Sequence, residues 1–180
     1  MLHILRKTKL AKTIDDAKAY LASTYKEEPK IRYSLSDTYF EDRADSYIDR
    51  ILRSGNYSDL HGLLDNARNL TFVEKVNAYI QERKIRETAI YKAAQMDRRL
   101  FSKVMADPQY KPSKDTALAM AYALRLNTDE AKDLLERAGY SFSHSNQRDI
   151  IMEYFFREGI FDLNKINYIL SELQMKCIGR

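Results

Sequence analysis

Helix-capping signals recur between residues 71 and 139 of this 180-residue chain, and they constrain its fold more than any other sequence feature. Thr71 is followed three residues later by Glu74, which is the spacing of a capping box. In that motif the Thr hydroxyl accepts from the third helical N–H, and the Glu carboxylate accepts from the Thr N–H. Asn127 and Glu130 repeat the spacing. The segment therefore predicts short helices joined by tight turns.

Five helices are predicted in this segment. The first follows Thr71, the second covers about residues 87–94, and the third begins after Asp97, which stands at an N-cap position. The fourth follows Ser113, and the fifth ends at Gly139, a residue that tolerates the left-handed C-cap. The apolar residues expected to point inward are Val73, Val76, Ala78, Tyr79, Ile80, Ile90, Ala94, Phe101, Val104, Met105, Ala117, Met120, Ala121, Leu124, Leu134 and Leu135.

Composition favours helices along the whole chain. Apolar residues make up 44% of it, which excludes general disorder. Five Gly and three Pro leave little material for long irregular loops, whereas Ala, Leu, Lys, Glu and Arg are abundant and favour helices. We therefore predict an all-α protein.

An N-terminal helical region is predicted in residues 1–70. Thr13 stands at an N-cap position and predicts a short helix before a Pro-containing linker at residues 26–34. Two further helices are expected, one ending at Arg53 and one over residues 60–67. The central segment, residues 71–139, would then be followed by a C-terminal helical extension, residues 140–180.

The C-terminal extension contains more apolar residues than one buried stripe needs. Ser145 or Asn146 is expected to cap a first helix, and Asp162 is expected to cap a second one after a break at Gly159. The apolar residues are Ile150, Ile151, Met152, Tyr154, Phe155, Phe156, Ile160, Phe161, Ile166, Ile169 and Leu170. They require a cover, which would be the N-terminal helices, a second copy of the chain or a partner protein.

Positive charge is concentrated in the middle of the chain. The formal net charge is +4. Residues 81–114 contain nine Lys or Arg against four acidic residues, a local charge of +5, whereas residues 1–70 contain twelve basic and eleven acidic residues. A polyanion partner would therefore meet the central segment.

The order and spacing of the five predicted helices resemble the λ-repressor-like, or XRE-type, helix-turn-helix domain. The resemblance is best in PSKDTALAMAYALRLNTDEA at residues 112–131. In that family a Pro and a small polar residue open the fourth helix, an Ala/Leu stripe follows, and a polar cap starts the fifth. The resemblance covers about 70 residues, under half of the chain. Residues 72–180 also resemble a helical C-terminal region of uncharacterised bacterial proteins, which implies no function.

The helix-turn-helix resemblance implies DNA binding, with the third helix in the major groove. Exposed Arg side chains there can bond to guanine, and flanking Lys side chains can bind phosphates. The residues that the resemblance assigns to DNA are Arg98, Arg99, Ser102 and Lys103 on the third helix, and Lys111 and Lys114 beside the turn before the fourth.

Three residues depart from the family's pattern near the third helix. Tyr91 stands where the family has Ala at the helix crossing, and Gln95 stands where it prefers Gly in the turn. Asp97 adds an acid at the tip of the third helix, unless capping of the Arg99 or Leu100 N–H occupies its carboxylate. The three positions affect how the third helix crosses the second and how it would enter the major groove of DNA.

Patterns for catalysis or metal binding are weak. The three His residues are far apart, and the Ser/His cluster SFSHSNQRD is better interpreted as a turn before a helix. The five Gly form no phosphate-binding loop, and the single Cys cannot form an internal disulfide. We predict no enzymatic activity, no cofactor and no metal.

Two functions remain from the sequence. The first is a cytoplasmic DNA-binding protein of helix-turn-helix type that acts as a transcriptional regulator. The second is a non-enzymatic protein-interaction module that keeps the scaffold without DNA recognition. No run approaches the roughly 18 apolar residues that cross a bilayer, so no membrane association is expected. A homodimer through the apolar C-terminal helices would suit DNA with two half-sites.

Overall fold

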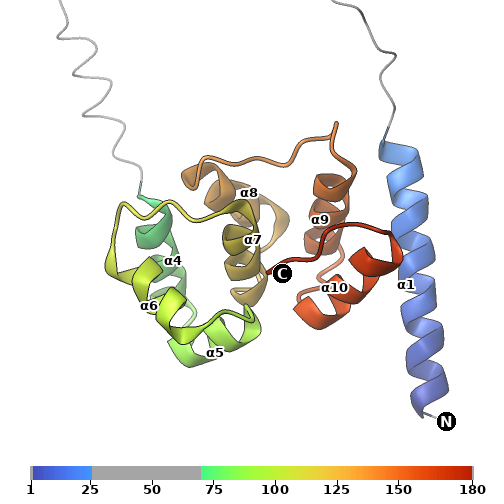
Figure 1. The fold of residues 1–180 in the computed structure, drawn as a ribbon, viewed down its shortest axis with the longest axis horizontal. Coiled ribbons are helices and arrows are strands. Elements are labelled where there is room, and N and C mark those ends of the chain that lie inside the picture. The colour runs from blue at the N-terminus through green and yellow to red at the C-terminus, as the bar shows by residue number, and fades with distance from the viewer. Residues whose placement is uncertain (1, 26–69, 180) are drawn as a thin grey trace, which may run out of the picture. The chain divides into compact units, whose positions relative to one another are not determined.

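The computed structural model describes residues 2–25 and 70–179, with side chains from residue 10 onward. All regular structure in these residues is helical, which confirms the predicted all-α class (Figure 1). The helices are α1 (Leu2–Thr24), α4 (Phe72–Glu82), α5 (Glu87–Ala93), α6 (Arg98–Ala106), α7 (Lys114–Ala123), α8 (Thr128–Arg137), α9 (Gln147–Arg157) and α10 (Leu163–Glu172).

The described helices belong to one compact unit, which consists of Met1–Glu27 and Leu70–Arg180. The N-terminal helix thus belongs with the central and C-terminal segments, although the sequence suggested three consecutive regions. The linker predicted at residues 26–34 and the helices predicted to end at Arg53 and to cover residues 60–67 lie outside the described residues.

The predicted capping boxes are confirmed at two helices. At α4 the Thr71 N–H donates to Glu74 Oε2 over 2.8 Å, and the Glu74 N–H donates to Thr71 Oγ1 over 3.3 Å. At α8 the same exchange joins Asn127 and Glu130 over 2.8 and 2.9 Å. Each exchange satisfies two N–H groups that the helix itself leaves without an acceptor, so it fixes where the helix begins.

Single side-chain caps begin four other helices at predicted positions. The Asp97 carboxylate caps α6, the Ser113 hydroxyl caps α7, and the Asp162 carboxylate caps α10. Of the two candidates before α9, Asn146 is the cap, and its side chain accepts from the N–H groups of Arg148 and Asp149. Local chemistry therefore sets the start of every helix from α6 to α10.

Helix α1 contradicts one predicted boundary. It begins at Leu2 and runs without interruption to Thr24, so Thr13 lies inside the helix and not at its start. The prediction of a helix beginning at Thr13 was wrong because residues 2–12 contain no Gly or Pro and are rich in Leu, Lys and Ala, which favour helix. A Thr at an N-cap spacing does not start a helix when the residues before it are themselves helical.

Helix α7 forms the centre of the core. Every residue from Ala117 to Tyr122 is buried, and α7 packs on both α5 and α8. The Tyr122 ring stacks on Phe156 of α9 with centroids 4.0 Å apart, and its hydroxyl donates to the Met152 carbonyl over 2.9 Å. Most of the predicted inward residues are buried, whereas Ala78, Ile80 and Met105 are half-buried. The apolar periodicity therefore located the core correctly.

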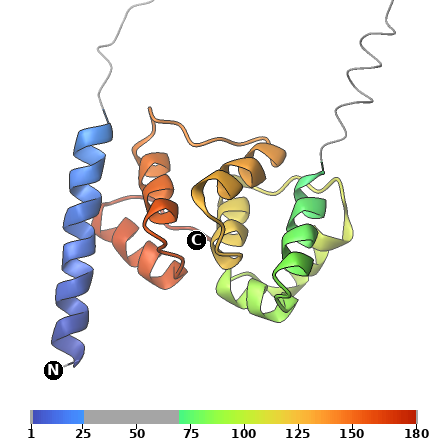
Figure 2. The same cartoon turned by 180° about the vertical axis from the view of Figure 1, so that it is seen from behind.

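Helix α1 packs along one side of α9 (Figure 2). Ala17 of α1 is fully buried, and the Tyr20 ring lies 5.1 Å from the Tyr154 ring, centroid to centroid. The Arg157 guanidinium lies 4.1 Å from the Tyr20 centroid, a cation–π contact. Of the covers that the sequence left open, the N-terminal helix is the one observed. On the C-terminal helices Tyr168 of α10 is 48% exposed, and the homodimer contact stays a prediction.

Candidate nucleic-acid interface

The turn between α5 and α6 has a left-handed residue at its centre. Helix α5 ends at Ala93 with Ala94 as its C-cap, and Gln95 adopts φ +51°, as a Gly would at this position. The Gln95 N–H donates to the Lys92 carbonyl, and the Met96 N–H donates to the Tyr91 carbonyl over 2.9 Å. These two bonds satisfy the end of α5, so the turn keeps its shape with Gln at a conformational cost of about 1 kcal/mol.

Tyr91 fills the contact between α5 and α6. Its side chain is half-buried, and its ring lies 5.9 Å from the Phe101 ring at an interplanar angle of 53°. Ile90 and Phe101 beside it are buried. The bulky residue that departs from the family's Ala is therefore accommodated as half of an aromatic pair.

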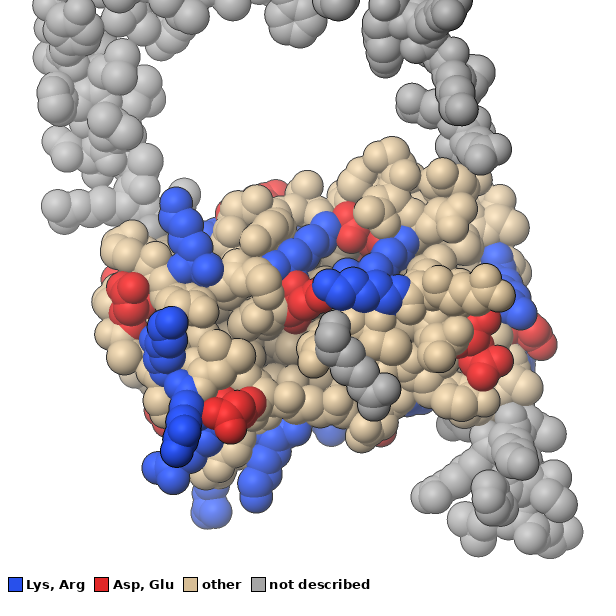
Figure 3. All heavy atoms as spheres, viewed as in Figure 1, with Lys and Arg blue, Asp and Glu red and all other residues tan. Residues whose placement is uncertain are grey.

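The exposed face of α6 carries the side chains assigned to DNA. Phe101 and Val104 are buried, at 2% and 0% exposed, and hold the helix against the core. The opposite face is basic, and in Figure 3 Lys and Arg side chains gather over α5 and α6 at the lower left. The exposed candidates on this face are Arg98, Arg99, Ser102 and Lys103, and Lys111 is exposed in the segment that follows α6.

Asp97 is engaged at the tip of α6. Its Oδ1 accepts the Arg99 N–H over 2.7 Å, which resolves the two capping partners left open by the sequence. A carboxylate at a helix N-terminus is stabilised by the N–H groups there. Part of the negative charge that would face a phosphate is therefore offset within the protein.

The basic side chains of this surface have no acidic partner in the described part of the chain. Arg98, Arg99, Lys103 and Lys111 form no ion pair with any described carboxylate, and their charged groups donate no hydrogen bond to a described residue. Free cations on an exposed helix face are available to an anionic ligand without first breaking an internal contact.

Lys114 is placed differently from the other candidates. Its Nζ lies 2.5 Å from Asp149 Oδ2 and donates to the Ser141 carbonyl over 2.7 Å. Asp149 is buried, and its carboxylate also accepts the Ser143 N–H. Lys114 therefore neutralises a buried acid, and the structure withdraws it from the set of free cations. The sequence could not show this pairing, because 35 residues separate the two partners.

Other basic residues are paired in the same way. Lys132 contacts Glu153 over 2.6 Å, and Arg148 contacts Asp115 over 2.7 Å. Burial opposes the ionisation of Asp115, but hydrogen bonds from Lys176 and Arg148 outweigh it and lower the pKa of this carboxyl. Burial likewise opposes ionisation of Glu153, but Lys132 and His144 lower its pKa.

The Ser/His cluster forms the turn that its sequence indicated. His144 Nε2 lies 2.9 Å from Glu153 Oε2, and the hydroxyls of Ser143 and Ser145 bond to each other. Neither of these two hydroxyls bonds to the imidazole. Among the residues that the structure describes, no group of three His, Cys, Asp or Glu could hold a metal ion.

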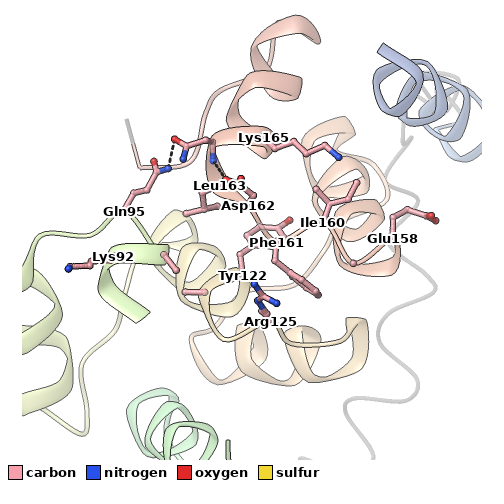
Figure 4. A pocket seen from close by; sticks show the side chains of 14 residues that line it. Lys92, Gln95, Tyr122, Arg125, Glu158, Ile160, Phe161, Asp162, Leu163 and Lys165 are labelled. Carbon is pink, nitrogen blue, oxygen red and sulfur yellow. Dashed lines mark hydrogen bonds between the residues drawn. The ribbon is translucent and has the colours of Figure 1, made fainter. Parts of the chain in front are cut away.

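A cavity beside the turn was not indicated by the sequence. It measures about 690 Å³ and lies between the end of α5, the end of α7 and the start of α10 (Figure 4). Three of its lining residues are basic, namely Lys92, Arg125 and Lys165. These residues are 73 positions apart at the extremes, so only the tertiary structure brings them to one cavity.

No protein-family model matches the chain, and no curated protein or solved structure matches it either. Within residues 2–25 and 70–179, no helix is both long enough and apolar enough to cross a bilayer.

Proposed function

We propose that this protein binds double-stranded DNA, with α5 and α6 acting as a helix-turn-helix pair within a λ-repressor-like arrangement of α4 to α8. The observation that carries the proposal is that the exposed cations on and beside α6 have no acidic partner among the described residues, whereas Lys114, Lys132 and Arg148 each contact a carboxylate. The protein would act in the cytoplasm as a transcriptional regulator, without catalysis, metal or cofactor.

Recognition would divide between the two ends of this surface. Arg98 and Arg99 stand in the first turn of α6, where side chains reach base edges when such a helix enters the major groove. An Arg guanidinium bonds bidentately to guanine O6 and N7, and the Ser102 hydroxyl can donate or accept. Lys103 and Lys111 would bind phosphates and set the register of the helix on the duplex.

The test is the salt dependence of binding to mixed-sequence duplex DNA, measured by fluorescence anisotropy. Binding should weaken steeply with salt, and Lys103→Ala/Lys111→Ala, which removes the two phosphate contacts, should flatten the slope of log K against log salt by about 1.8, whereas Arg98→Ala/Arg99→Ala should lower the affinity. A matched control is Lys12→Ala/Lys18→Ala, which removes two exposed cations from α1. Failure of the wild-type protein to bind DNA at low ionic strength would remove the proposal.

One observation favours the alternative, a protein-interaction surface. Leu100 of α6 is 39% exposed and lies between Arg99 and Lys103 in the sequence. A contact made only by charged groups would not need an exposed apolar side chain at this place. Arg is enriched at protein interfaces, and an apolar side chain beside it would add apolar area to the contact. A protein partner that stays bound to Arg98→Ala/Arg99→Ala but is lost with Leu100→Ser would support this function over DNA binding.

A further inference from the structure

The cavity beside the α5–α6 turn has a surplus of available positive charge. Lys92, Arg125 and Lys165 line it, and none of them forms an ion pair with a described residue. Its two carboxylates are already engaged. Glu158 pairs with Arg157 over 3.1 Å, and Asp162 accepts the Asn164 N–H over 2.9 Å as the cap of α10. The groups left available to a ligand are therefore cationic.

The cavity is joined to the candidate DNA-reading helix. Gln95 lines it, and its Nε2 donates to Asn164 Oδ1 over 2.8 Å, which ties the turn to the start of α10. Arg98 follows Gln95 by three residues, so the first turn of α6 lies within about 10 Å of the cavity. The major groove is about 12 Å wide, so a helix that enters it has a phosphate backbone at this distance.

The geometry of the cations favours an extended anion over a compact one. In Figure 4 the ammonium ends of Lys92 and Lys165 point away from the cavity in opposite directions, and Arg125 lies lower in the view, between them from left to right. Groups that diverge in this way cannot close on one small anion. A sugar–phosphate backbone, which repeats its charge along its length, can meet them in succession.

We propose that this cavity, together with Lys92, Arg125 and Lys165, is a second DNA contact that binds the sugar–phosphate backbone flanking the base pairs read by α6. The inference rests on the proposed DNA-binding function and adds α10 and the end of α7 to the interface. The two Lys side chains supply phosphate contacts, and the bond between Gln95 and Asn164 fixes the distance between the two parts of the interface.

The test compares Lys92→Ala/Lys165→Ala with Lys12→Ala/Lys18→Ala on mixed-sequence duplex DNA. Arg125 is left in place, so that the variant and the control each remove two cations. Loss of two phosphate contacts should flatten the slope of log K against log salt by about 1.8. The α1 control should leave the slope unchanged.

A second measurement follows the side-chain amide signals of Gln95 and Asn164 by NMR during titration with DNA or with inorganic phosphate. We expect both signals to shift with DNA and to stay in place with millimolar phosphate. If DNA binds and needs Arg98 and Arg99, but the Lys92/Lys165 variant behaves like the α1 control and the amide signals stay in place, the second contact is wrong while the proposed function stands. A larger response to phosphate than to DNA also overturns it.

Discussion

Two groups of basic residues in this protein have the same chemistry and different surroundings. Those on and near α5 and α6, such as Arg98, Arg99 and Lys103, are exposed and unpaired with any described acid. Those on α7 to α9, such as Lys114 and Arg148, contact acids that are wholly or largely buried. The difference teaches that a count of Lys and Arg overstates a binding surface, because tertiary partners already neutralise part of it.

Lys114 should give the largest effect on stability. Lys114→Ala leaves the buried Asp149 carboxylate without its cation, and we expect a loss of about 3 kcal/mol in the free energy of unfolding, measured by urea denaturation. Lys111→Ala, three residues earlier on an exposed side chain, is the matched control and should change it by less than about 0.5 kcal/mol. If the two variants lost equal stability, the distinction between cations that pair with buried acids and exposed, unpaired cations would be wrong.

Arg148→Ala should also lower the stability of the protein, by less than Lys114→Ala, and should leave DNA binding unchanged. Its guanidinium contacts Asp115 and donates to the Lys176 carbonyl, and both ion-pair side chains are partly exposed. We expect Arg148→Ala to cost about 2 kcal/mol of stability, because a partly exposed acid recovers some solvation. Its salt slope for DNA binding should match that of the wild type. A flattened slope would place Arg148 in the DNA interface and contradict the comparison.

The paired acids predict a loss of stability in acid. The pKa values of Asp115 and Glu153 are lowered in the folded protein, so the unfolded chain binds protons first as the pH falls. Their contribution is present above the ordinary carboxyl pKa of about 4 and is lost as the pH falls through the lower folded values. Urea midpoints measured between pH 6 and pH 3 should show this fall, and Asp115→Asn should make it shallower.

The smallest effect concerns a free cation at a helix end. Lys84 follows α4 at φ +51°, where Gly is unstrained, so Lys84→Gly should raise the free energy of unfolding by up to about 1 kcal/mol. Lys92→Gly makes the same substitution inside α5 and should lower it by about 1 kcal/mol. Thermal unfolding of both variants tests whether the free energy of unfolding rises with Lys84→Gly and falls with Lys92→Gly. Destabilisation by Lys84→Gly would show that its side chain has a role in folding.

The sequence was sufficient for features that depend on near neighbours. The capping residues Thr71, Asp97, Asn127 and Asp162 were predicted because a cap and its N–H partner lie within three residues. The buried and exposed faces of α6 followed from helical periodicity for the same reason. Thr13 was the exception, because its spacing suits a cap but the helix continues on both sides of it.

From residue 71 onward the sequence by itself determined where the helices begin and where their apolar faces lie, since capping bonds within one turn set the starts and the helical period sets the faces. Only the tertiary structure decided that α1 packs along α9, that Lys114 belongs to Asp149, and that Gln95 meets Asn164. These contacts join residues 35 or more positions apart, and many acids along the chain could have paired with each cation. Packing selects one partner among them, and that selection leaves the cations of α6 free.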